Sequence, residues 1–200
     1  MIVASFLALV AAAESRPLFY WGARAAVIAA PALSTPSLEA RVLEVHAAQD
    51  ALGLVLRLTF DRPLRETLHL ADGSPVSGRL RAVLYCDSDG DRATGWRAGE
   101  NDLRRGSEWR LEIGTLAVGA DAQEQLEAQS LVTVNLQALA QDGSRHSLWR
   151  ADQGAAPRQI AVRGEWLELR LPREHSRASA RPRLILADGD TLLDGRIPVP

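Results

Sequence analysis

Three aspartates at alternate positions are the feature of this sequence that most suggests chemistry. Asp87, Asp89 and Asp91 lie in the run YCDSDGDRATGW, directly after an apolar stretch. Carboxylates at this spacing can fold around one cation, and Ca²⁺ suits them because it takes six to eight oxygen ligands in irregular geometry. The run is not an EF-hand, since Arg92 and Ala98 stand where that loop needs glycine and glutamate. The alternative is a polar turn whose aspartates cap backbone N–H groups.

The segments around this loop predict an all-β fold. Leucines alternate with other residues over 52–60, the pattern of a strand with one buried face. Turn signals separate many such short patterns, and only 121–129 is typical of a short helix. We expect an antiparallel two-sheet β-sandwich of the jelly-roll or immunoglobulin-like kind. The other predicted strands are 38–47, 64–70, 78–86, 108–118, 130–139, 145–151, 159–163, 165–171 and 183–187.

Strand parity assigns two tryptophans to opposite environments. Trp109 shares a face with the apolar residues of its strand, which predicts a core position. In the segment GEWLELRLP the leucines supply the apolar face, so Trp166 lies on the other face with Glu168 and Arg170. An indole on a polar face can mark a binding surface.

An apolar segment, residues 1–35, precedes the predicted domain. Residues 2–13 form a short apolar run that ends in small residues, as in a secretory signal, but without the usual basic start. Residues 25–33 form a second run with an Ala-x-Ala pattern at Ala30 and Ala32. Neither run reaches the roughly 18–20 apolar residues that span a bilayer. We expect a secreted or periplasmic protein with no transmembrane span and one β-sandwich domain over 36–200; the alternative is a cytosolic protein that keeps an N-terminal helix.

Composition and motifs exclude several classes of function. The net charge of -2 gives no basic surface for nucleic acid. The single Cys86 cannot form an internal disulfide or a cysteine-based zinc site, and its place in a strand pattern predicts a buried small hydrophobe. The chain carries no GxSxG, HExxH, P-loop or dinucleotide-binding motif, so we do not expect an enzyme. A carboxylate-based hydrolase is the weaker alternative.

The aspartate loop resembles part of a known family of exported β-sandwich domains. The run LYCDSDGDRATG, followed by GSEWRLEI, is similar to carbohydrate-binding module family nine and to the related DOMON group. The later segments GEWLELRLP and ADGDTLLDGRIP resemble the closing strands of that family. The resemblance implies a two-sheet sandwich, a structural Ca²⁺ and, in some members, a sugar-binding surface.

The resemblance also implies a set of metal ligands. That set is Asp87, Asp89, Asp91 and Glu108. Glu100 and Asp102 lie in the intervening loop and are the alternatives to Glu108. DOMON members that hold haem use methionine and histidine ligands, and Met1 is the only methionine here, so we expect no haem.

Sugar recognition needs an aromatic plane that stacks on the apolar face of a pyranose. Trp96 in the loop and Trp166 on the polar face are the candidates, and packing at the core or rim is the alternative for each. We therefore predict a non-enzymatic exported module that binds a glycan or another envelope ligand and carries a structural Ca²⁺. The alternative is a structural or protein-interaction sandwich without metal or sugar. The sequence does not predict an oligomeric state.

Overall fold

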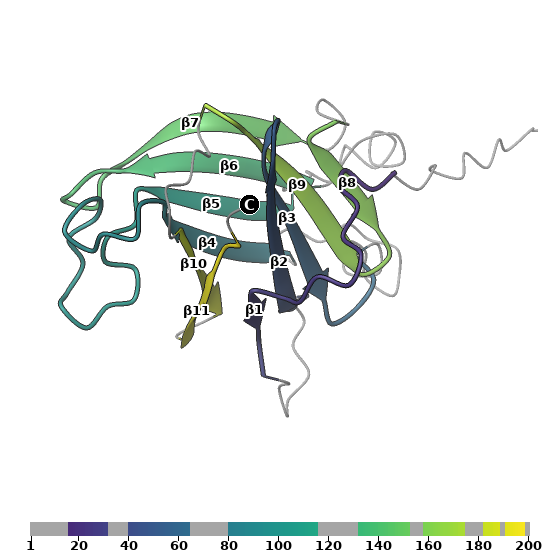
Figure 1. Ribbon diagram of the computed structural model, residues 1–200, viewed down its shortest axis with the longest axis horizontal. Helices are drawn as coiled ribbons and strands as arrows, with labels where there is room; N and C mark the ends of the chain where they lie inside the picture. The colour runs from purple at the N-terminus through teal and green to yellow at the C-terminus, as the bar shows by residue number, and fades with distance from the viewer. Residues whose placement is uncertain are drawn as a thin grey trace, which may run out of the picture.

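Two antiparallel sheets make up the described part of the protein, as a computed structural model of the chain shows (Figure 1). The structure describes residues 16–31, 40–64, 80–115, 132–152, 158–174, 182–188 and 191–198. The predicted all-β sandwich is therefore confirmed. The expected helix over 121–129 lies outside the described residues, as does nearly all of the expected strand over 64–70.

The first sheet has five strands in the order β1-β2-β3-β9-β8. Their bounds are β1 Ile28–Ala29, β2 Val42–Asp50, β3 Gly53–Phe60, β8 Ile160–Arg163 and β9 Trp166–Pro172. The leucine alternation that predicts β3 places Leu54, Leu56 and Leu58 in the core, each at most 1% exposed. Leu167 and Leu169 on β9 stand opposite β3 in register and share this buried face.

The second sheet has six strands in the order β11-β10-β4-β5-β6-β7. Their bounds are β4 Arg81–Asp87, β5 Trp109–Thr115, β6 Val132–Leu139, β7 Arg145–Asp152, β10 Arg183–Asp188 and β11 Thr191–Arg196. Trp109 is 4% exposed and lies in the core, as its strand parity predicts. Cys86 is also a core residue, as predicted, and burial raises the pKa of its thiol well above the usual value.

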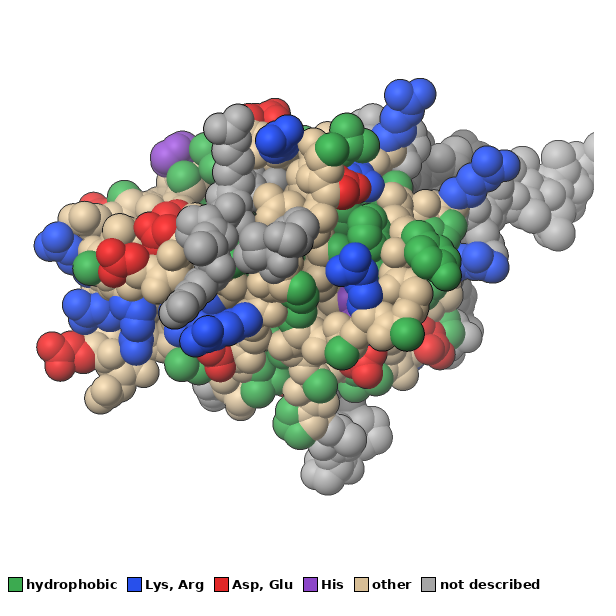
Figure 2. All heavy atoms as spheres, in the orientation of Figure 1, with side chains coloured by type: hydrophobic (Ala, Val, Ile, Leu, Met, Phe, Trp, Pro, Cys, Tyr) green, Lys and Arg blue, Asp and Glu red, His purple; other side chains and the backbone are tan. Residues whose placement is uncertain are grey.

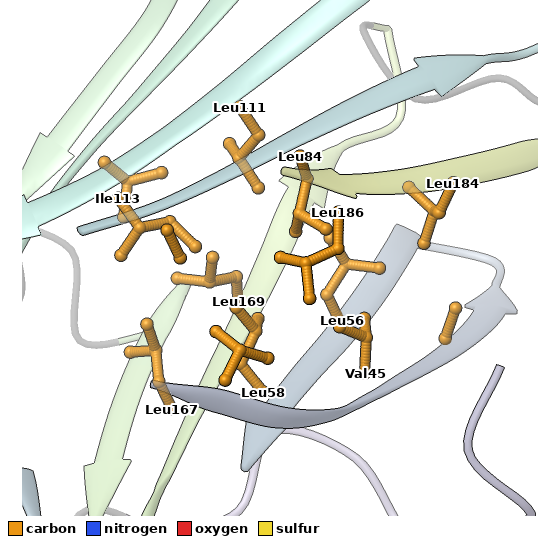
Figure 3. Close-up of a cluster of buried hydrophobic side chains, with 14 of the residues drawn as sticks. Val45, Leu56, Leu58, Leu84, Leu111, Ile113, Leu167, Leu169, Leu184 and Leu186 are labelled. Carbon is orange, nitrogen blue, oxygen red and sulfur yellow. The ribbon is translucent and has the colours of Figure 1, made fainter. Parts of the chain in front are cut away.

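The core lies between the sheets and consists mainly of leucine. Figure 3 shows Leu84, Leu111 and Ile113 of the six-stranded sheet pointing toward Leu58 and Leu167 of the five-stranded sheet. Each fully buried aliphatic side chain contributes about 1.5–3 kcal/mol to folding through the area removed from water. This packing fixes the ends of β4 and β5, and those ends carry the acidic loop.

The five-stranded sheet begins before residue 36, the expected start of the domain. β1 pairs with β2, and Ile28 is 3% exposed in the main core. Residues 16–24, which we call the N-terminal strap, lie against the outer face of the same sheet, where Trp21 is 6% exposed. In Figure 1 this purple segment runs from the region of β8 across the molecule to β1. Among the described residues, no helix is long and apolar enough to cross a bilayer.

Candidate metal centre

The acidic loop connects two neighbouring strands of the six-stranded sheet. β4 ends at Asp87, β5 begins at Trp109, and residues 88–108 join them. The two strands pair antiparallel, and the backbone N–H of Glu108 donates to the carbonyl of Cys86 at 2.9 Å. Asp87 and Glu108, which are 21 positions apart in the chain, are thereby brought side by side. Figure 2 shows acidic and basic side chains gathered at the left end of the molecule, where this loop projects in Figure 1.

Three of the four predicted ligands lie together. Carboxyl oxygens of Asp87, Asp89 and Glu108 all lie within 4.8 Å of one another. Asp91 does not belong to this group, because its carboxylate caps the backbone N–H of Ala93 at 2.9 Å. The structure thus gathers the distant glutamate and two of the three aspartates, and the third aspartate serves the turn.

Backbone donors hold the three carboxylates in place. Gly90 N donates to Asp87 Oδ1 at 2.6 Å, and Asp91 N donates to Asp89 Oδ1 at 2.8 Å. Ser88 N donates to Glu108 Oε2 at 2.6 Å. The aspartates therefore cap backbone N–H groups, as expected for a polar turn. Each carboxylate still has lone pairs that these hydrogen bonds do not use.

The hydroxyl of Thr94 lies between Asp89 and Glu108 and has fewer protons than it has acceptor neighbours. Its Oγ1 lies 3.0 Å from Asp89 Oδ2, 2.9 Å from Glu108 Oε1 and 2.8 Å from the backbone oxygen of Asp91. All three are acceptors when the acids are ionised, and a hydroxyl has one proton to donate. At least two of these close contacts therefore lack a hydrogen, and a cation or an extra proton would relieve them.

The pKa values of two of the acids are raised, which agrees with a lack of positive charge around the cluster. Burial raises the pKa of Asp87, and the nearby Asp89 adds to the effect. Burial likewise raises the pKa of Glu108, although hydrogen bonds from Ser88 and Thr94 oppose it. A cation among these groups would stabilise their ionised forms.

One arginine already contacts the cluster. Arg183 on β10 stands opposite Asp87 in register, and its Nη2 lies 3.2 Å from Asp87 Oδ2. The same nitrogen donates to the carbonyl oxygens of Leu103 and Arg105 at 3.0 and 3.2 Å. Arg183 therefore compensates the charge of Asp87 and links the loop to β10. The oxygens around Thr94 belong to other residues of the loop, which Arg183 does not contact through their side chains.

The two alternative ligands take other roles. The carboxylate of Asp102 accepts from the Arg104 guanidinium at 2.6–3.2 Å, and these hydrogen bonds lower the pKa of Asp102. The backbone oxygen of Glu100 accepts from Arg92 at 3.1 Å, and its side chain is outside the acidic cluster. Glu108 is therefore the better match to the distant ligand.

Two glycines allow the loop to close tightly. Gly95 has a φ of 54°, and a Cβ built on it would lie 2.5 Å from the backbone oxygens of Gly106 and Ser107. Gly106 has a φ of 91°, and its Cβ would lie 2.8 Å from the Cα of Arg92. Both conformations are strained for residues with side chains, so these positions require glycine.

Trp96 anchors the acidic loop on the outer face of the six-stranded sheet. Its ring stacks on Tyr85 with centroids 6.0 Å apart, and the Arg104 guanidinium lies over it at 5.0 Å from the centroid. Its backbone N–H donates to Ser107 and its carbonyl accepts from Gly106, both at 2.9 Å. The indole is half-buried, and packing explains most of its position.

Trp166 lies far from the loop, on the outer face of β9, as its strand parity predicts. It is half-buried, and the Arg57 guanidinium lies 4.9 Å from its ring centroid. Glu168, two residues on, is 0% exposed and forms a salt bridge with Arg57 at 2.6 Å. The face that the sequence marks as polar is thus covered, and its indole stacks against a cation.

Comparisons with known proteins add no identification. No protein-family model, curated protein or solved structure matches this chain, so the resemblance to carbohydrate-binding module family nine stays a prediction. The sequence reasoning missed Thr94 as a central group of the site. Thr94 is part of the quoted motif, so the sequence did contain the residue. Its role could not be inferred, because the role of a hydroxyl depends on which acceptors surround it in three dimensions.

Proposed function

We propose that the protein is a non-enzymatic exported binding module whose acidic loop is held by one Ca²⁺. The observation that carries the metal proposal is the single Thr94 proton among several close acceptor oxygens. Asp87, Asp89 and Glu108 would hold the ion, with Thr94 Oγ1 and the backbone oxygen of Asp91 beside it. All these groups are oxygens, the donor type that Ca²⁺ prefers.

The role of the ion would be structural. The three acids also accept backbone N–H groups of their own loop, so they fix its path. Bound Ca²⁺ would neutralise the cluster and join the end of β4 to the start of β5. The ion would coordinate the carboxylates and reduce the repulsion between them.

The ligand would be a glycan or another molecule of the cell envelope, bound beside the loop. Trp96 is the favoured aromatic, because it lies two residues from Thr94 and the metal would fix its backbone. Arg104 borders the same surface, with its guanidinium over Trp96 and over the buried Tyr85, and a guanidinium plane suits the hydroxyls of a pyranose. Trp166 is the second candidate platform and has the Arg57 guanidinium over its ring.

The metal proposal is tested by thermal unfolding of the full chain with excess Ca²⁺ and with chelator. An ion at about 100 times its Kd adds roughly 2.7 kcal/mol, which shifts the Tm of a chain of this size by roughly 5–10 °C. Asp89→Ala removes the shift. Asp91→Asn is the matched control and keeps most of it, because that carboxylate lies outside the cluster. Equal Tm values for the wild type in both buffers would rule the metal out.

The ligand proposal is tested on a glycan array with the wild type, Trp96→Ala and Trp166→Ala. Loss of binding in the Trp96 variant alone, with an unchanged far-ultraviolet spectrum, supports the surface beside the loop. Loss in the Trp166 variant alone moves the platform to the other sheet. Failure of the wild type to bind any glycan favours the structural or protein-interaction alternative.

A further inference from the structure

The N-terminal strap, residues 16–24, closes a charged face of the five-stranded sheet. The indole Nε1 of Trp21 donates to Glu168 Oε1 at 2.6 Å, and the backbone N–H of Leu18 donates to Glu168 Oε2. Arg170 in turn donates to the carbonyl of Leu18 at 2.8 Å. Both oxygens of a carboxylate that is 0% exposed therefore accept hydrogen bonds from the strap, and for Oε1 these add to the Arg57 salt bridge.

The strap also packs against apolar and cationic groups. Trp21 covers Ala48 and Val55, which are 1% and 0% exposed. The Arg57 guanidinium lies 5.3 Å from the centroid of Trp21 and 4.9 Å from that of Trp166, so one cation contacts both indoles. An exposed carboxylate and an exposed apolar strip would remain if the strap were absent.

The chain that follows the strap is part of the sheet. Val27 N donates to Val45 O at 2.8 Å, and Ala30 N donates to Leu43 O at 2.7 Å on either side of β1. A Cβ on Gly195 of β11 would lie 1.8 Å from the carbonyl oxygen of Val27, so β1 also packs tightly against the edge of the second sheet. The second apolar run of the sequence is thus used as a strand.

We infer that the strap and β1 belong permanently to the working domain, and that a leader, when removed, is cut upstream of Arg16. Cleavage at the Ala-x-Ala pattern of Ala30 and Ala32 would remove Trp21 and Ile28, and with them two N–H donors of Glu168 and the apolar cover of Ala48 and Val55. The position of the cut rests on the proposed export; the permanence of the strap does not.

Two neighbouring substitutions test the strap in the full chain. Trp21→Ala should lower the Tm by roughly 5–10 °C, the range expected for loss of a largely buried aromatic. Tyr20→Ala is the matched control and should leave the Tm nearly unchanged, because Tyr20 is 88% exposed. Trp21→Phe keeps the ring but loses the donor to Glu168, and should give a smaller fall. Equal Tm values for wild type and Trp21→Ala would overturn the inference.

The position of the cut is read from the intact mass of chain recovered from the envelope of a Gram-negative host. A first residue at or before Arg16 supports the inference, and any later first residue, at 33 above all, overturns it. A chain found uncleaved in the cytoplasm would contradict the proposed export alone, since the Trp21 and Tyr20 comparison still decides whether the strap is docked.

Discussion

A single buried carboxylate on one sheet of this sandwich and a cluster of three carboxylates on the other differ in how their negative charge is compensated. Glu168 on the five-stranded sheet receives Arg57, the Trp21 indole and the Leu18 backbone N–H, so its two oxygens are fully served. At the end of β4, the carboxylates of Asp87, Asp89 and Glu108 gather, with Asp89 and Glu108 both on the Thr94 hydroxyl, and Arg183 contacts Asp87 alone of the three. The first group needs nothing from solution, and the second lacks positive charge.

The difference shows that burial of an acid does not by itself indicate a ligand. Glu168 is the more deeply buried group, yet its partners all come from the chain. Glu168 links β9 to the strap and to β3 through these hydrogen bonds. The acidic loop is more exposed, but the number of acceptors around Thr94 exceeds the protons available. The balance of donors and acceptors, and not depth, separates the Glu168 ion pair from the proposed metal site.

The largest expected effect is loss of the Glu168 charge. Glu168→Gln keeps the shape of the side chain but leaves Arg57 without its carboxylate, and removing one partner of a buried pair is strongly destabilising. We expect a loss of about 3 kcal/mol in the free energy of unfolding, equal with and without Ca²⁺. Denaturant unfolding in both buffers measures it. A loss that Ca²⁺ restores would show that the two groups are not independent.

The next effect concerns the backbone of the acidic loop. Gly106→Ala places a Cβ 2.8 Å from the Cα of Arg92 and 3.3 Å from Asp87 Oδ2, at a φ of 91°. Gly164→Ala in the β8–β9 turn is the matched control, because its φ of 54° is also positive but no atom lies within 4 Å of the new Cβ. We expect losses of about 2 and about 1 kcal/mol, respectively, from strain and crowding. Comparable losses would mean that the loop yields easily around Gly106.

A smaller effect of opposite sign is expected for Asp89 in metal-free buffer. Asp89→Asn removes one negative charge and adds an N–H₂ donor next to Thr94 and Glu108. We expect the free energy of unfolding to rise by about 0.5–1 kcal/mol, the usual contribution of a hydrogen bond gained without new desolvation. Chelator-treated wild type and variant are compared by denaturant unfolding. A destabilised variant would show that the wild-type oxygens are already satisfied without a metal.

The smallest effect is a difference in pH dependence between the two regions. The raised pKa of Glu108 gives stability that is present at low pH and lost as pH rises through its folded value. Asp50 lies beside the strap, where burial opposes the change but Arg170 and Leu52 lower its pKa. Its contribution is present at neutral pH and lost as pH falls below about 4.

The contribution of each acid to the pH dependence of stability is obtained in metal-free buffer, as the difference between the wild type and a variant that lacks the acid. The stability of wild type relative to Glu108→Gln should increase as pH falls from 7 toward 4. The stability of wild type relative to Asp50→Asn should decrease over the acid range. The two differences should therefore change in opposite directions over the acid range. Slopes of the same sign would remove the electrostatic distinction between the regions.

Much of the fold could be predicted from the sequence because period-two alternation reports a half-buried strand directly. β3 and β9 follow the leucine pattern, and the core position of Trp109 follows from its parity. β1 and β11 were not predicted. β1 has two residues inside an apolar run that also suits a leader, and β11 carries a mixed pattern after a turn.

The candidate site was only partly predictable, because its decisive feature is a count of donors in three dimensions. Spacing identified Asp87 and Asp89, and the family resemblance identified Glu108. Spacing also placed Asp91 in the site, although its side chain caps the turn. Arg183 is 96 residues from Asp87, and only the pairing of β10 with β4 reveals that contact.

Calorimetric titration of the chelator-treated full chain with Ca²⁺ tests the central claim most directly. The account predicts one ion bound per chain, with a Kd at or below the roughly 10⁻⁴–10⁻³ M typical of extracellular calcium modules. It also predicts that the heat disappears in Asp89→Asn. Titration of the wild type to millimolar Ca²⁺ without any saturable heat, together with an unchanged Tm, would contradict it and leave Arg183 as the counter-ion of a metal-free loop.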